Sequence, residues 1–313
     1  MNLVFLDTKT IGVVPNLHLL EQFGKVDYHE TTRPEETLER IKDADIVITN
    51  KVVLDKTIIE RANKLKLICV AATGTNNIDK AAALERGIPV KNAADYSSKS
   101  VAQGTFSLLL LLINNIPYYD NYVKQGDYSQ SDIFTHYGKP FWELSGKRFG
   151  IIGLGNIGRQ VAKIADAFGT EVVYYSASGQ TTSELYQRLD LEELLSTSDI
   201  VSIHAPLNEH TSNLINYDRL NIMKRSSILI NAGRGGIVNE ADLARAIDED
   251  LIAGAGIDVF EKEPIDLNNP LLKVQKKDKL VLTPHVTWAS IEARILLIEK
   301  VARNIREYLE DNT

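Results

Sequence analysis

Residues 150–176, "GIIGLGNIGRQVAKIADAFGTEVVYYS", decide the fold of this chain. An apolar run leads to Gly153, and Gly155 and Gly158 complete the spacing G-x-G-x-x-G before an amphipathic stretch that ends near Gly169. In that context the glycines allow a tight turn, a close backbone approach to a pyrophosphate and close packing of helix on strand. The stretch therefore predicts a strand–turn–helix–strand unit that binds a dinucleotide.

The position that usually selects the dinucleotide is occupied by Ser176. An acidic residue about 20 residues beyond the glycines normally binds the adenosine ribose hydroxyls and repels a 2′-phosphate. Ser176 removes that barrier to NADP. The following residues 177–184, "ASGQTTSE", contain no Arg or Lys that would attract a phosphate. We therefore expect NAD as the cofactor and treat NADP as admissible.

Outward from this stretch, short apolar runs alternate with amphipathic segments in two series. The first series occupies residues 1–98, and the second begins at residue 150. Such alternation predicts an α/β protein with two doubly wound parallel sheets. Between the series we expect one long helix over 97–125, bent by Pro117, and then a long structured loop over 126–147.

Composition narrows the class of protein. The 313 residues carry 35 Lys and Arg against 42 Asp and Glu, for a net charge of −7, which argues against nucleic acid or an anionic membrane as partner. The N-terminus lacks a secretory signal pattern, and the most apolar run, "FSLLLLLINNI", is too short to cross a bilayer. Cys69 is the single cysteine, and no metal-binding spacing is present. We expect a cytoplasmic protein without a metal.

Three polar motifs each follow a predicted strand of the second series. "NAGRG" carries Arg234, "DVFEKEP" carries Glu263 and "TPH" carries His285. Each has an ordinary structural interpretation taken singly, as a surface arginine, a turn before Pro264 or a core histidine. Together, at the sheet edge where ligands bind, they suit carbonyl reduction: Arg holds a carboxylate, His transfers a proton, and Glu favours the protonated ring. The cofactor would carry the hydride.

Several blocks in this order resemble the D-isomer-specific 2-hydroxyacid dehydrogenase family. They are "VAATGTNNID", "SVAQGTFSLLLLL", "GIIGLGNIGRQVA", "VSIHAPLNEHTSNLI", "LINAGRGGIVNEADLARAI", "AGAGIDVFEKEP" and "TPHVTWASIEAR". The resemblance implies a flavodoxin-like substrate-binding domain formed by residues 1–98 plus 286–313. It also implies a Rossmann-type NAD-binding domain over 99–285, a cleft between the two domains, and a homodimer built around the nucleotide domains.

The resemblance also implies roles for individual residues. The catalytic trio is Arg234, Glu263 and His285. Substrate contacts are implied at Thr73, Gly74, Thr75, Arg234, His285 and Trp288. Cofactor contacts are implied at Thr105, Gly153, Gly155, Asn156, Ile157, Gly158, Ser176, His204, Ala205, Pro206, Thr211, Ala232, Gly233, Arg234, Asp258 and His285.

Within the family, "DYSSKSVAQ" and "SQSDIFTHYGKPFWELSGK" resemble glycerate dehydrogenases, also called hydroxypyruvate reductases. The expected reaction is reduction of hydroxypyruvate or glyoxylate to D-glycerate or glycolate. Two alternatives stay open: another D-2-hydroxyacid dehydrogenase, acting on a D-lactate-like or 3-phosphoglycerate substrate, and an NAD(H)-sensing corepressor-like protein. Formate dehydrogenases usually carry Gln at the position of Glu263.

Overall fold

The computed structural model describes residues 1–312, which form two compact units. Unit 1 contains residues 1–97 and the chain from Ala289 onward, and unit 2 contains Ser98–Trp288. Each unit holds one parallel sheet, so the expected α/β class with two parallel sheets is confirmed. The cleft expected between the domains stays a prediction.

Unit 1 is built on five parallel strands in the order β2-β1-β3-β4-β5, the flavodoxin-like order. The strands are β1 (Asn2–Phe5), β2 (Lys25–Tyr28), β3 (Ile46–Thr49), β4 (Leu67–Val70) and β5 (Val90–Asn92). The helices are α1 (Pro34–Ile41), α2 (Lys56–Arg61), α3 (Lys80–Glu85) and α10 (Ile291–Asp311), with 3-10 turns η1 (Thr8–Ile11) and η2 (Leu17–Phe23).

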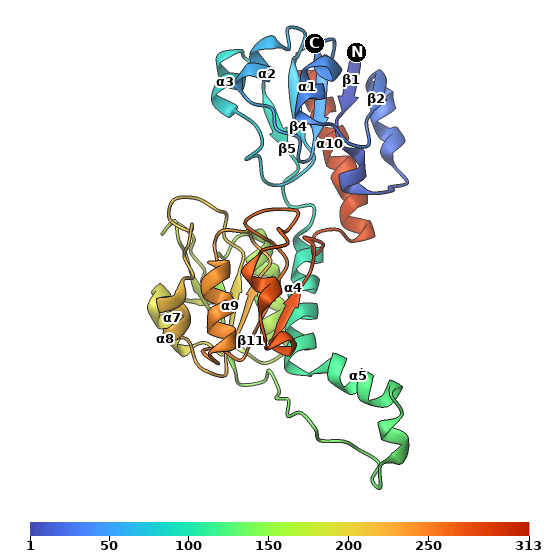
Figure 1. Cartoon of the computed structure of the whole chain (residues 1–313). Helices are drawn as coiled ribbons and strands as arrows, with labels where there is room; N and C mark the ends of the chain where they lie inside the picture. Colours follow the sequence, from blue (N-terminus) through green and yellow to red (C-terminus); the bar gives the residue numbers. More distant parts are fainter. Residues whose placement is uncertain (313) are drawn as a thin grey trace. The chain divides into compact units, whose positions relative to one another are not determined.

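Both faces of this sheet are covered, which explains why its strands are apolar throughout. Val4, Val47 and Ile68 point to the face that packs on α1–α3. The C-terminal helix α10 packs on β4 and β5 and buries Leu297, Ile305 and neighbouring apolar residues (Figure 1). The last helix of the chain thus completes the first sheet.

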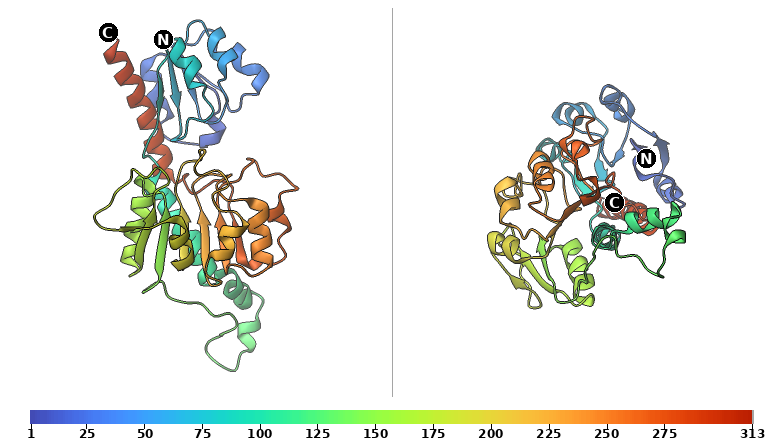
Figure 2. Two further views of the ribbon diagram at one scale, coloured as in Figure 1. Left: turned by 90° about the vertical axis from the view of Figure 1, so that its left-hand side faces the viewer. Right: turned by 60° about the horizontal axis from the view of Figure 1, so that its bottom comes forward.

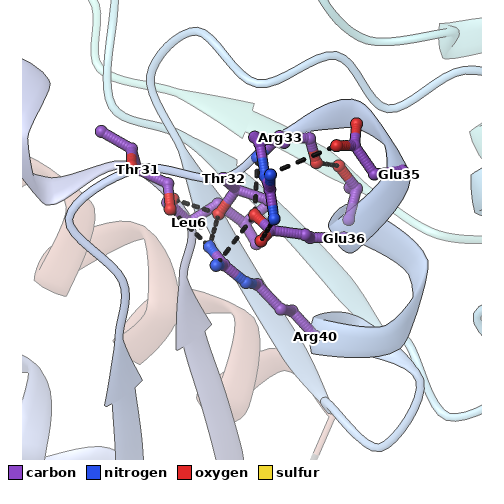
Figure 3. A network of polar contacts seen from close by, with 8 residues as sticks. Leu6, Thr31, Thr32, Arg33, Glu35, Glu36 and Arg40 are labelled. Atoms are coloured by element: carbon purple, nitrogen blue, oxygen red, sulfur yellow. Dashed lines mark hydrogen bonds and ion pairs between the residues drawn. The ribbon is translucent and has the colours of Figure 1, made fainter.

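A polar network fixes the loop between β2 and α1 (Figure 3). The Thr32 hydroxyl donates to the carbonyl of Leu6, beyond the end of β1, and the Arg40 guanidinium donates to the Thr32 hydroxyl and to the carbonyl of Thr31. Glu36 accepts from the Arg33 amide at 2.9 Å and from its guanidinium at 2.7 Å, which caps α1. The Arg33 side chain lowers the pKa of Glu36 to about 2.

Unit 2 holds seven parallel strands in the order β12-β11-β10-β9-β6-β7-β8. The strands are β6 (Arg148–Ile152), β7 (Glu171–Tyr175), β8 (Gln187–Arg188), β9 (Ile200–Ile203), β10 (Ile228–Asn231), β11 (Gly254–Ile257) and β12 (Leu280–Leu282). The helices are α4 (Ser98–Ile113), α5 (Ile116–Lys124), α6 (Asn156–Ala167), α7 (Leu191–Thr197), α8 (Tyr217–Ile222) and α9 (Glu240–Asp248), with 3-10 turns η3 (Asp127–Gln130), η4 (Pro270–Lys273) and η5 (Lys277–Lys279).

Alternate residues of these strands feed two separate cores. Phe149 and Ile151 of β6 join the core under α4 and α6, whereas Ile152 joins the core under α7, α8 and α9. Figure 1 shows α7, α8 and α9 away from α4 across the sheet. The strand order reverses between β6 and β9. In doubly wound sheets a ligand binds at the carboxyl ends of the strands at this point.

The predicted long helix is in fact two helices. α4 ends at Ile113 and α5 begins at Ile116, with Asn115 in the left-handed region at φ +49° and a bend of 60° between the axes. Pro117 lies in the first turn of α5, where its missing N–H leaves no helical hydrogen bond unmade. The long helix is therefore interrupted before the proline and is not kinked at it. Within residues 1–312 no single helix is long and apolar enough to cross a membrane, although α4 and α5 would pass as a bent pair on length and composition alone.

α5 and the loop that follows it project from the rest of unit 2 (Figures 1 and 2). We call residues 116–141 the arm. Its side chains include Ile133, Phe134, Tyr137 and Phe141, which are 57–88% exposed. Tyr122 stacks on His136, with ring centroids 3.8 Å apart, and the Tyr118 hydroxyl and His136 Nε2 share a hydrogen bond of 2.8 Å, which gives the arm internal structure.

Candidate active site

The three fingerprint glycines have three different surroundings. A Cβ on Gly153, whose φ is +95°, would lie 2.7 Å from the Ala205 amide nitrogen, and one on Gly158 would lie 2.2 Å from the Gly153 carbonyl oxygen. A Cβ on Gly155, the N-cap of α6, would meet nothing within 4 Å. Gly153 and Gly158 are therefore required by packing, whereas Gly155 leaves open space before the α6 amides, as a pyrophosphate requires.

A half-buried histidine lies beside this turn, directly after β9. The Nε2 atom of His204 shares a hydrogen bond of 2.8 Å with the Ser202 hydroxyl. Its Nδ1 atom is buried and has no hydrogen-bond partner among the described residues. Burial lowers the pKa of His204 to about 3, so the ring is neutral. An unpartnered buried ring nitrogen at the switch point fits a polar group of a bound dinucleotide.

The segment after β7 closes on itself around Ser176. The Ser176 hydroxyl, which is buried, accepts from the Thr181 amide at 3.3 Å. Two arginines from outside the segment also reach it. Arg188 of β8 donates to the Gly179 carbonyl at 2.8 Å, and Arg159 of α6 donates to the Thr182 carbonyl at 2.9 Å. Residues 177–184 contain no Arg or Lys, but in the folded chain β8 and α6 bring two arginines to this segment.

Arg234 lies in a turn that β10 and β11 hold rigidly. The Asn231 side chain accepts from the Gly233 amide at 3.1 Å and donates to the Arg234 carbonyl at 3.0 Å. A Cβ on Gly235 would lie 1.8 Å from the Phe260 carbonyl oxygen, so only glycine fits. The Arg234 guanidinium makes one hydrogen bond of 2.8 Å, to the Gly233 carbonyl. Its remaining donors can bind a carboxylate.

Glu263 and His285 meet directly, although 21 residues separate them in the chain. A Glu263 oxygen lies 2.8 Å from His285 Nδ1, and its other oxygen accepts from the Phe260 amide at 3.1 Å. His285 Nε2 has no protein hydrogen bond within residues 1–312. The carboxylate therefore orients the ring and leaves Nε2 available to exchange a proton with a ligand.

Asp258 supports the backbone that carries His285. This fully buried carboxylate accepts from the Thr283 hydroxyl at 2.6 Å, the Val286 amide at 2.8 Å, and the Thr287 amide and hydroxyl at 3.1 and 2.6 Å. The loop it gathers holds His285 at φ +51°, a conformation that non-glycine residues seldom adopt. Both oxygens accept two hydrogen bonds, so Asp258 positions the loop that carries His285. The cofactor contact that the family resemblance implies for Asp258 stays a prediction.

In unit 1, the segment Thr73–Thr75 follows β4, and the Thr73 hydroxyl donates to the Ala93 carbonyl at 3.3 Å. Asn92 donates to the Thr73 carbonyl at 2.6 Å, and Asn77 donates to the Val52 carbonyl at 2.9 Å. Among the described residues, the Gly74 and Thr75 amides donate to no other group. They are therefore able to bind an anion.

The other predicted residues have structural partners of their own. Thr105 is fully buried, and its hydroxyl donates to the Val101 carbonyl at 2.8 Å. The Thr211 hydroxyl donates to the Pro206 carbonyl at 2.6 Å. Asn156, Ile157, Ala205, Ala232 and Gly233 lie at the start of α6 or directly after β9 and β10, and Trp288 is the last residue of unit 2. Their ligand contacts stay predictions.

Comparison with known proteins adds the family. The sequence profile described as "D-isomer specific 2-hydroxyacid dehydrogenase, NAD binding domain" matches residues 106–287. The chain is similar to a glycerate dehydrogenase of Methylorubrum extorquens, 37% identical over 307 residues that cover 98% of this chain and 95% of the relative. It is similar to a hydroxypyruvate reductase of Blautia hydrogenotrophica, 36% identical over 296 residues that cover 93% and 91%. A solved acyclic imino acid reductase in complex with NADPH and D-Arg superposes with a TM-score of 0.89 at 29% identity, covering 99% and 98% of the two chains.

The surroundings of Gly158 and Gly155 predict different effects of substitution by alanine: one variant should lose stability, and the other should lose dinucleotide affinity. Gly158→Ala should destabilise the protein by about 1–3 kcal/mol, because the methyl group meets a backbone oxygen. Gly155→Ala should leave the unfolding free energy within about 1 kcal/mol of wild type but weaken dinucleotide binding, since the methyl group occupies the open space. Urea denaturation and NADH and NADPH titration measure the two effects. Equal destabilisation by both variants would contradict this assignment.

Proposed function

The chain belongs to the D-isomer-specific 2-hydroxyacid dehydrogenase family, and from that premise we propose that it reduces hydroxypyruvate and glyoxylate to D-glycerate and glycolate. As a family member it is an NAD(P)-dependent 2-hydroxyacid dehydrogenase. The observation that carries the proposal is the 2.8 Å hydrogen bond between Glu263 and His285 Nδ1. The names of the relatives at 36–37% identity support the choice of substrate.

In this proposal the residues of unit 2 perform the polar part of the reaction. The nicotinamide ring, when bound, supplies the hydride. Arg234 binds the substrate carboxylate by a bidentate pair, and His285 Nε2 donates a proton to the carbonyl oxygen as negative charge develops there. In the reverse direction the neutral ring accepts the hydroxyl proton. Glu263 stabilises the imidazolium through Nδ1 and prevents the ring from rotating.

In this proposal, residues of unit 1 also bind the carboxylate of the 2-oxo acid. The Gly74 and Thr75 amides are proposed to donate to a carboxylate oxygen, as the family resemblance implies. Elsewhere in unit 1, Asp7 is a buried carboxylate that holds the loop after β3, accepting from the Asn50, Lys51 and Val52 amides at 2.8, 2.6 and 3.2 Å. Burial raises the pKa of Asp7 although the three amides oppose the rise.

Turnover on a panel of 2-oxo acids tests the reaction. Hydroxypyruvate and glyoxylate should show higher kcat/KM than pyruvate or phosphohydroxypyruvate, with NADH and NADPH assayed in parallel. Arg234→Gln should lower kcat/KM by about 10³, equivalent to about 4 kcal/mol of transition-state binding. Arg225→Gln, a surface control, should retain activity. Tight NADH or NADPH binding without turnover of any 2-oxo acid would indicate a dinucleotide sensor instead.

The pH dependence tests the Glu263–His285 pair. Reduction needs the protonated ring and therefore fades as pH rises, whereas oxidation needs the neutral ring and grows. Glu263→Gln removes the negative charge beside Nδ1, so both limbs should move to lower pH. Glu261→Gln, an exposed acid two positions earlier, is the matched control. Unchanged limbs in Glu263→Gln would contradict the pairing.

We also propose that the chain forms a homodimer through unit 2. The arm exposes Phe134 and Phe141 to 88% and 62%, and a hollow of about 400 Å³ on the α4 and α6 surface is lined by Phe106, Leu110 and Phe168. Exposed apolar surface of this kind is typical of a protein interface.

Sedimentation velocity tests the homodimer. The variant with both Phe134→Ser and Phe141→Ser should shift a dimer towards monomer, because apolar area is lost from the arm. Leu267→Ser, which changes a residue of unit 2 that is 89% exposed outside the arm, should not. A wild-type monomer, or a dimer that the double variant leaves intact, would contradict this proposal.

A further inference from the structure

The loop between β7 and β8 has a composition that suits a phosphate. Residues 176–183, "SASGQTTS", include five hydroxyl side chains and no carboxylate, and the first acid is Glu184. The loop leaves the carboxyl end of β7, the strand beside the fingerprint strand β6. In dinucleotide-binding sheets this is the place of the adenosine ribose.

Two arginines from different elements bracket that loop. Arg159 lies one residue beyond the last fingerprint glycine, on α6, and reaches the Thr182 carbonyl at 2.9 Å. Arg188 lies on the edge strand β8 and reaches the Gly179 carbonyl at 2.8 Å. The loop carbonyls thus hold both guanidinium groups at the ribose end of the dinucleotide site.

Both guanidinium groups retain donors for a ligand. An Arg side chain has five N–H donors, and each of these two spends one on a loop carbonyl. Within residues 1–312 neither forms an ion pair with a carboxylate, unlike Arg33, Arg40 and Arg148. Two exposed guanidinium groups without a counter-ion, aimed at one hydroxyl-rich loop, match the charge and planar geometry that phosphate recognition uses.

Ser176 removes the group that would oppose this use. A carboxylate at its position would bind the ribose hydroxyls of NAD and repel a 2′-phosphate. The buried Ser176 hydroxyl instead accepts from the Thr181 amide and closes the loop. The site therefore lacks the usual attraction for NAD and has two charges that favour NADP.

We propose that Arg159 and Arg188 bind the 2′-phosphate of NADP(H), so that the chain binds NADPH more tightly than NADH. The proposal rests on the dinucleotide site assigned above and names the cofactor of the proposed reductase. It requires no particular 2-oxo acid.

Equilibrium binding to the full-length protein, followed by nicotinamide fluorescence, tests the proposal without turnover. Wild type should bind NADPH at least tenfold more tightly than NADH. Arg159→Gln and Arg188→Gln should each weaken NADPH binding about tenfold, as expected for loss of a charge-assisted bond, and leave NADH binding within about twofold. Lys163→Gln removes the same charge one turn further along α6 and should preserve the preference.

Adenosine 2′,5′-bisphosphate and 5′-AMP repeat the comparison without the nicotinamide half. The bisphosphate should bind more tightly, and the double variant Arg159→Gln with Arg188→Gln should remove the difference. NADH binding as tight as NADPH in wild type, or variants that weaken both cofactors equally, would overturn the proposal. A preference for NADPH without turnover of any 2-oxo acid would support the phosphate site and refute the proposed reaction. Turnover of 2-oxo acids without a preference for NADPH would support the proposed reaction and refute the phosphate site.

Discussion

The contact between Gly158 and the Gly153 carbonyl is the constraint on which unit 2 depends. A methyl group at Gly158 would lie 2.2 Å from that oxygen, so α6 approaches β6 more closely than any side chain permits. This approach brings the α6 N-terminus over the carboxyl edge of the sheet, and it brings Gly153 against Ala205 at the end of β9. The open space at Gly155 lies between these two tightly packed glycines.

Two buried carboxylates organise the loops at the two sheet edges. Asp258 follows β11 and gathers amides and hydroxyls of Thr283–Thr287, and Asp7 follows β1 and gathers the amides of Asn50–Val52. Hydrogen bonds to a charged group are worth roughly 1.5–3 kcal/mol each, and they oppose the cost of burying the charge. At Asp7 they do not cancel that cost, because the pKa of its carboxyl is still raised by burial. Both loops carry or adjoin residues predicted to bind the substrate. Asp258 thus sets the geometry of the loop that carries His285, and Asp7 sets that of the loop after β3.

Structural features that depend on neighbouring residues could be predicted from the sequence. Contacts between residues that are far apart in the chain could not. The glycine spacing and the apolar strands predict the two sheets, and the motifs after β10, β11 and β12 place Arg234, Glu263 and His285 at one edge. The sequence around Pro117 did not predict that the helix ends before Asn115, because a proline can either bend a helix or occupy the first turn of a new one. The hydrogen bonds of Asn231 could have been predicted, because it lies in "NAGRG" next to the residues that it contacts. The contacts of Asn77 and Asn92 could not, because they join segments that are distant in the sequence.

The ribose end of the dinucleotide site shows this limit most clearly. Residues 177–184 carry hydroxyl groups and no Arg or Lys. Taken alone, they predict NAD, because nothing in them would attract a 2′-phosphate. Selectivity at that end is a difference between two binding energies, so a repulsive acid and an attractive arginine act on the same ratio. The arginines come from α6 and β8, and strand pairing and helix packing bring them to the loop. Loss of the acid and gain of two remote charges change the ratio in one direction, although only the loss is visible in the local sequence.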